Sequence, residues 1–211
     1  MDKNYVVEDS WNLPQQTNQY LYDKWRGRPA IKQSQLGDHR KTFVALEQLD
    51  AMHKKQLDFF EQRTKSQEFV AIHSSHYDWW FFPIDERSGH GYKFTVTEEE
   101  VEMLKKDLVY MQNLRRGIHL LLFAWGFDSN TNQFVKNPKK GQQWTRYPVR
   151  LYKAGRCAQI FGEAKLFDSI LTFTRNRVVD NDPNNLDELV FSSSFTGKKE
   201  NALDLWQLAL W

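Results

Sequence analysis

The longest helical pattern in the chain runs from Thr97 to Trp125 and reads TEEEVEMLKKDLVYMQNLRRGIHLLLFAW. Thr97 and Glu100 have the spacing of a capping box, in which the side chain of each residue satisfies the backbone N–H of the other. Apolar residues then recur at alternating spacings of three and four, as along the buried face of a helix. The pattern predicts one long central helix at about 97–125, which Gly126 ends.

The middle of this helical pattern holds one interruption. Arg115 takes the one seam position that is not apolar, and Gly117 follows it closely. We expect either a kink or a closely approaching neighbour at this point. From Ile118 to Trp125 the sequence is apolar on nearly all sides of a helix, which predicts a place at the centre of the core.

The residues before this helix divide into a polar segment and a second helical pattern. Residues 1–38 are polar and mixed, so we interpret them as an N-terminal extension with a short helix at Thr17–Arg26. A helical pattern then runs from Asp38, its expected N-cap, to Lys65. His53 lies near the apolar stripe of that helix, where we expect a histidine at the edge of the core with one hydrogen bond.

Aromatic and histidine side chains gather between Glu68 and Phe94, in the stretch EFVAIHSSHYDWWFFPIDERSGHGYKF. The run Phe69–Ile72 is either a strand, which would pair with Phe94–Val96 as a small β-hairpin, or the start of an irregular segment. Proline and glycine residues predict a loop over most of 83–92.

Four residues of this stretch are candidates for chemistry, namely His73, His76, Asp78 and His90. Imidazole and carboxylate ligands suit zinc, iron or manganese, so a divalent metal site is one hypothesis, although no cofactor is predicted. A second hypothesis has no metal: His76 acts as a general base that Asp78 or Asp85 orients. In the structural alternative, these polar groups bond loop backbone while the aromatic block at 79–82 fills the core.

A charge asymmetry follows the central helix, because the residues from Ser129 to Gly162 include no carboxylate. The basic and aromatic residues of this segment are Lys136, Lys139, Lys140, Trp144, Arg146, Arg150, Tyr152, Lys153 and Arg156. Basic side chains neutralise phosphates and exposed aromatic rings stack on unpaired bases, so the segment predicts a surface for nucleic acid or another polyanion. In the alternative, the basic face pairs with Glu98, Glu99, Glu100 and Glu102 or with an acidic partner.

Composition limits the class of protein. A chain of 211 residues with 15% aromatic residues fits a folded single domain, and a net charge of +2 does not by itself indicate a nucleic-acid partner. No glycine-rich phosphate loop is present, which argues against a nucleotide-binding fold. The single cysteine, Cys157, fits a reducing compartment and is expected to be a buried, inert thiol. The N-terminus lacks an apolar signal sequence and no apolar run is long enough to span a bilayer, so we expect a soluble, cytoplasmic protein.

The C-terminal third predicts further helix. A helical region runs over about 149–177 with an interruption near Gly162. The end of the chain, Asn201–Trp211, is amphipathic and needs an apolar surface to cover it. That surface is either the protein's own core or a second copy of the chain, which would make a homo-oligomer.

Together these patterns predict a mainly α-helical, single-domain protein with a possible small β-hairpin, in which residues 39–211 form the helical domain. The leading functional hypothesis is a non-catalytic protein that binds another macromolecule, a protein or a polyanion, through the basic and aromatic surface at 136–156. The alternative is a metal- or histidine-dependent hydrolase centred on His73, His76, Asp78 and His90.

Overall fold

The computed structural model describes residues 28–176, which form a mainly helical fold with one small β-hairpin. This confirms the predicted fold class. The helices predicted at Thr17–Arg26 and Asn201–Trp211 lie outside the described residues. The described residues include seven α-helices: α2 (Leu46–Lys65), α3 (Phe69–Ser74), α4 (Asp78–Phe81), α5 (Glu98–Lys106), α6 (Leu108–Ala124), α7 (Pro148–Ile160) and α8 (Ala164–Thr174).

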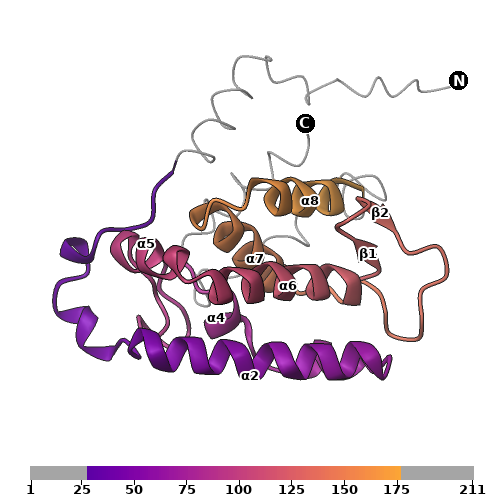
Figure 1. The fold of residues 1–211 in the computed structure, drawn as a ribbon, viewed down its shortest axis with the longest axis horizontal. Helices are drawn as coiled ribbons and strands as arrows, with labels where there is room; N and C mark the ends of the chain where they lie inside the picture. Colours follow the sequence, from indigo (N-terminus) through magenta and orange to yellow (C-terminus); the bar gives the residue numbers. More distant parts are fainter. Residues whose placement is uncertain (1–27, 177–211) are drawn as a thin grey trace, which may run out of the picture.

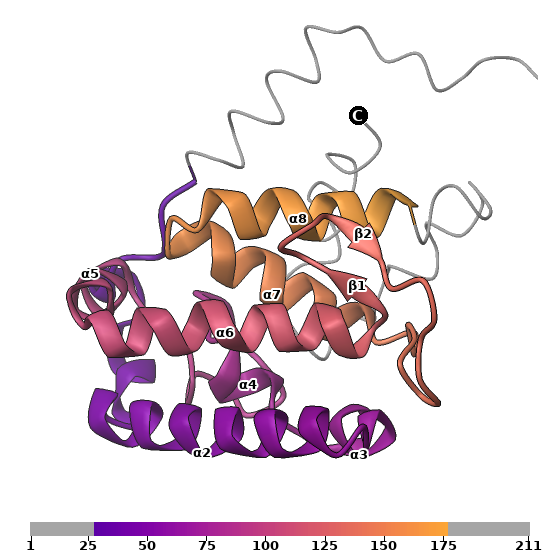
Figure 2. The ribbon, with the colours of Figure 1, turned by 45° about the vertical axis from the view of Figure 1, so that its right-hand side comes forward.

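The helices pack in layers around α6. Figures 1 and 2 show α2 and α8 on opposite sides of α6, with the short α4 between α2 and α6. α7 packs against both α8 and α4, so it joins the two sides of the molecule. The packed body reaches back at least to residue 30, because Ala30 and Leu36 are buried.

The predicted central helix is two helices, and the break lies at Asp107 rather than near Arg115. The predicted capping box is present, since the backbone N–H of Thr97 donates to Oε2 of Glu100 and the Thr97 hydroxyl accepts from the backbone of Glu100. Asp107 ends α5 and caps α6, because its Oδ1 accepts from the backbone N–H groups of Val109 and Tyr110 at 2.9 and 3.0 Å. An N-cap carboxylate of this kind starts a new helix inside an otherwise continuous helical pattern.

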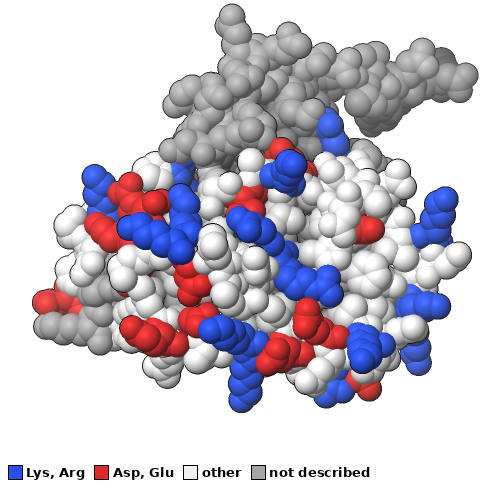
Figure 3. All heavy atoms as spheres, in the orientation of Figure 1, with Lys and Arg blue, Asp and Glu red and all other residues white. Residues whose placement is uncertain are grey.

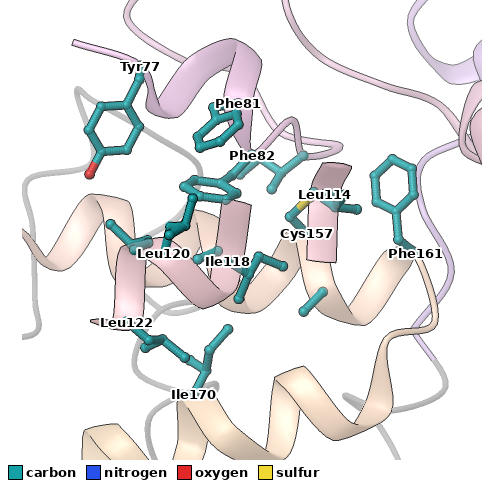
Figure 4. Packing of buried hydrophobic residues seen from close by; sticks show 14 of the residues in the cluster. Tyr77, Phe81, Phe82, Leu114, Ile118, Leu120, Leu122, Cys157, Phe161 and Ile170 are labelled. Atoms are coloured by element: carbon teal, nitrogen blue, oxygen red, sulfur yellow. The ribbon is translucent and has the colours of Figure 1, made fainter. Parts of the chain in front are cut away.

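Gly117 marks a close neighbour and not a kink. A Cβ atom at this position would lie 2.6 Å from Cζ of Phe81, so only glycine lets the aromatic ring approach the backbone of α6. Figure 4 shows Phe81 and Phe82 on one side of α6, and Ile170 of α8 on the other side. The predicted approach of a neighbouring element at this point is therefore confirmed.

The run Phe69–Ile72 is the first part of helix α3 and not a strand. A helix buries Phe69, Ile72 and His73 on one side and leaves Val70 exposed, whereas a strand would separate Phe69 and Ile72 onto opposite faces. The hairpin therefore forms elsewhere, between β1 (Phe127–Asp128) and β2 (Gln133–Phe134), which pair antiparallel.

Two further helix predictions have different outcomes. Asp38 does not cap α2, because it belongs to a short 3₁₀ helix, Gly37–Thr42, and α2 begins only at Leu46. The predicted interruption near Gly162 is confirmed: α7 ends before this glycine, which has a φ of 76°, and α8 follows it. Among the helices of residues 28–176, none combines the length and apolar composition that crossing a bilayer requires.

Two buried side chains of the core were singled out from sequence. Cys157 is buried as predicted, and burial raises the pKa of its thiol. His53 is not at the edge of the core but fully buried, with its ring 4.7 Å from the ring of Phe81 and 4.9 Å from that of Tyr110. Neither nitrogen of its imidazole has a hydrogen-bond partner within the described part of the chain.

Candidate functional site

α7 carries three basic side chains, Arg150, Lys153 and Arg156, spaced three residues apart. Residues three apart are neighbours on a helix surface, so the three side chains form a row. All three are buried. A buried charge needs a partner of opposite charge or a set of hydrogen bonds. The partners of these three side chains therefore show whether the row is structural or can bind a ligand.

Arg156 has the most complete set of partners. It donates from Nε and Nη2 to the two carboxylate oxygens of Asp85, at 2.9 and 2.7 Å. Its three other bonds go to Oε1 of Gln159 and to the carbonyl oxygens of Arg28 and Pro29. All five N–H donors of the guanidinium group are therefore used. The pair ties α7 to the segment after α4 and to the chain at residues 28–31.

Lys153 pairs with the other carboxylate of the same stretch. Its Nζ lies 3.1 Å from Oδ2 of Asp78 and 5.3 Å from the centre of the Trp79 ring. Burial lowers the pKa of Lys153, and the neighbouring Asp78 opposes this effect. The ammonium group is thus enclosed between a carboxylate and an indole.

Arg150 binds the backbone between α3 and α4. Its guanidinium group donates to the carbonyl oxygens of His73 and Ser75, at 2.6 and 2.9 Å, and its Nε lies 3.8 Å from Oδ1 of Asp78. The same group lies over the rings of Tyr77 and Tyr147, 4.6 and 4.0 Å from their centres. A cation near the C-terminal end of a helix satisfies carbonyl groups that lack partners within the helix. Arg150 therefore fixes where α3 ends.

Tyr152 completes the contact between α7 and the stretch after α4. Its hydroxyl group donates to Oε1 of Glu86 at 2.7 Å. Burial raises the pKa of Glu86, while the bond from Tyr152 and the nearby Arg28 lower it. The segment 78–86 thus supplies three carboxylates to α7.

Four residues of the predicted basic surface are therefore internal: Arg150, Tyr152, Lys153 and Arg156. The prediction of a continuous surface over 136–156 is wrong for this part, because α7 is covered by the Asp78–Glu86 segment. The ion pairs seen for these basic side chains are with Asp78 and Asp85, rather than with the alternative partners Glu98 to Glu102. Glu100 caps α5 and Glu102 pairs with Lys105.

The other part of the basic segment is exposed. The loop from Lys136 to Tyr147, which we call the lysine loop, exposes Lys136, Lys139, Lys140 and Arg146. Trp144 is half-buried, with its ring edge-on to Trp125 at 4.8 Å. Tyr147 is 38% exposed. A groove of about 510 Å³ adjoins the loop between Lys140, Arg63 and Val70.

The face of the molecule seen in Figure 3 carries charges of both signs. Figure 3 shows basic and acidic side chains interspersed on the face that α2 and α6 present. Opposite charges at short range cancel much of each other's field, so this face lacks the single-sign field that attracts a polyanion.

The candidate histidines do not converge. His73 is buried and its Nε2 lies 2.9 Å from the carbonyl oxygen of Gly141. His76 and His90 are exposed, and both contact Trp79: the ring of His76 is stacked at 6.0 Å, and that of His90 is edge-on at 4.5 Å. Within residues 28–176, no three histidine, cysteine or carboxylate side chains are grouped as a metal site requires.

The proposed orientation of His76 by a carboxylate is also not seen. Asp78 is held by Lys153 and Asp85 by Arg156, and neither carboxylate hydrogen-bonds to an imidazole within the described residues. The tautomer of a catalytic histidine is set by the hydrogen bond that its other ring nitrogen makes, often to a carboxylate. The geometry therefore favours a structural role for Asp78 and Asp85.

Glu86, which accepts the hydrogen bond from Tyr152 of α7, was not among the residues singled out from sequence. A signal for it was present, because Asp85 and Glu86 directly follow the apolar run Phe81–Ile84. Carboxylates that enter the core with such a run need basic partners. The segment 129–162, which has basic residues and no carboxylates, could supply basic partners for Asp85 and Glu86.

The chain was also compared with known proteins. No model of a protein family, no curated protein and no solved structure matches it. We therefore infer the function from the geometry of the described residues.

Proposed function

We propose that the protein is a non-catalytic binding protein that contacts a polyanion, such as nucleic acid, through the lysine loop. The observation that carries the proposal is the division of the basic segment. The side chains on α7 are neutralised internally, whereas Lys136, Lys139 and Lys140 remain exposed in a segment without carboxylates.

The chemistry of the loop supports a polyanionic partner. Lysine side chains bind phosphate groups and release the counterions condensed on them, which gives an affinity that depends steeply on salt. Tyr147 adds an exposed ring whose position is fixed by the guanidinium group of Arg150. An aromatic ring fixed in this way can stack on an unpaired base. The partner that fits these features is a single-stranded nucleic acid.

The first prediction concerns a variant in which Lys136, Lys139 and Lys140 are all replaced by glutamate. We expect much weaker binding to a fluorescent single-stranded oligonucleotide. Because each phosphate contact contributes about 0.7 to the slope of log affinity against log salt, the slope should fall by about two. The unfolding midpoint should change little, since all three side chains are exposed. Fluorescence anisotropy over a salt series measures the affinity and slope.

A matched control separates the site from net charge. Replacement of Lys32, Lys55 and Lys106 by glutamate changes the net charge equally at exposed positions outside the loop. This control should keep most of the salt slope. Equal losses in both variants, or wild-type affinity that does not respond to salt, would remove the loop from consideration as a polyanion site.

A further inference from the structure

A second groove, of about 720 Å³, lies between α6, the turn of the β-hairpin and the start of α8. Arg115, Arg116 and His119 line it from α6, and Lys165 lines it from α8. Its volume falls within the range of about 300–1,000 Å³ that is usual for small-molecule sites. No residue of the lysine loop lines this groove, so its ligand need not be the partner of the loop.

The two arginines are held by carboxylates that leave donors free. Arg115 donates from Nε and Nη2 to both carboxylate oxygens of Glu163, at 2.9 and 2.7 Å. Arg116 donates from Nε to Glu61 at 3.1 Å. Within residues 28–176, Nη1 of Arg115 and both terminal nitrogens of Arg116 make no hydrogen bond. A guanidinium group held on one side and free on the other is oriented in advance for an oxyanion.

His119 adds a neutral donor beside the arginines. Its Nδ1 lies 2.9 Å from the hydroxyl oxygen of Ser129 and 3.4 Å from Nδ2 of Asn130. The amide nitrogen of Asn130 is a donor, so this contact favours the tautomer that carries its proton on Nε2. Burial, together with Arg116, lowers the pKa of His119. Its Nε2–H is therefore available to a ligand without an added positive charge.

The carboxylates of the groove restrict where an anion can lie. Glu163 is neutralised by Arg115, Asp168 lies on the α8 side, and Asp128 lies 4.0 Å from His119 on the Nδ1 side of its ring. The α6 side, with Arg116 and His119, is thus the more favourable place for negative charge. Ser129, Asn130 and Asn132 of the hairpin turn offer neutral hydrogen-bonding groups to the rest of a ligand.

We propose that this groove binds a phosphate group, either as the free ion or as the monoester of a small polar molecule. The free donors of Arg116, the Nε2–H of His119 and the nearby Lys165 match the several acceptor oxygens of a phosphate. A carboxylate would leave more of these donors without a partner, because it has only two oxygens.

The test uses inorganic phosphate, adenosine 5′-monophosphate and adenosine as probes. NMR follows the imidazole signal of His119, assigned with His119→Gln. Both phosphate-bearing probes should shift this signal to saturation, and adenosine should not. Arg116→Gln should weaken binding by about tenfold or more, because a charge-assisted hydrogen bond is lost. Tighter binding of the monoester would identify the small molecule as the source of the phosphate.

Control variants keep the test specific. Arg116 and Glu61 are both about half exposed, so the variant should fold normally. Arg87→Gln removes an exposed arginine outside the groove and should bind phosphate as the wild type does. The proposal is wrong if neither phosphate probe shifts the His119 signal to saturation, or if Arg116→Gln binds unchanged. The lysine-loop variant should keep phosphate binding, so this test is independent of oligonucleotide binding.

Discussion

Arg156→Met is expected to lower the free energy of unfolding by about 3–5 kcal/mol, because it leaves the buried carboxylate of Asp85 without its cation. The substitution also removes the bonds to the carbonyl oxygens of Arg28 and Pro29. Asp85→Asn should have an effect of similar direction, since it leaves the guanidinium group buried without a counter-charge. Urea-induced unfolding, monitored by tryptophan fluorescence, measures both changes.

The double variant tests whether the two side chains act as a pair. Its loss of stability should be smaller than the sum of the two single losses by more than about 1 kcal/mol. The pair Arg115–Glu163 is the matched control, because it has the same two-bond geometry but Arg115 is 50% exposed. Its coupling should stay below about 1 kcal/mol. Equal coupling in the two pairs would show that Arg156 is not buried as described.

Acidification is expected to destabilise the protein through His53. Burial lowers the pKa of its imidazole from 6.5 to about 3. Between these two pH values the unfolded chain binds a proton at His53 that the folded chain does not bind. The stability that the neutral His53 contributes is therefore fully present above pH 6.5. It is lost progressively as the pH falls from 6.5 to about 3. At about 1.4 kcal/mol for each unit of pKa, the total loss is on the order of 5 kcal/mol.

His53→Leu separates this effect from the titration of carboxylates, which both proteins share. The variant removes a buried imidazole that has no hydrogen-bond partner among the described residues. Its stability advantage over the wild type should widen by up to about 1.4 kcal/mol for each pH unit below 6.5. Urea unfolding at several pH values gives this difference. A difference that stays constant with pH would mean that His53 becomes protonated in the folded protein.

The fold was predictable where a local signal coincided with the tertiary packing. Thr97 and Glu100 gave the start of α5, and Gly117 gave the approach of Phe81 to α6. The break at Asp107 was not predicted, because the apolar spacing continues across it and only the cap geometry shows the new helix. Phe69–Ile72 was ambiguous for a different reason, since a short apolar run has too few residues to distinguish a helix from a strand.

The candidate site was less predictable, because its residues meet through tertiary contacts. The row Arg150, Lys153 and Arg156 has the spacing of a basic helix face, and spacing alone does not tell whether such a face meets solvent or carboxylates. The partners Asp78 and Asp85 lie more than 70 residues earlier in the chain. Only their packing against α7 shows that the basic segment divides into an internal helix and an exposed loop.

Lysine acetylation of the folded protein, followed by mass spectrometry, tests this division most directly. Lys136, Lys139 and Lys140 are exposed and should react quickly, whereas Lys153 is 2% exposed and should react only when the chain unfolds. Denatured protein, in which all four lysines are accessible, gives the reference rates. We expect strong protection at Lys153 alone among these four. Reaction of Lys153 as fast as Lys140 in the folded protein would contradict this expectation, and α7 would then be part of the surface.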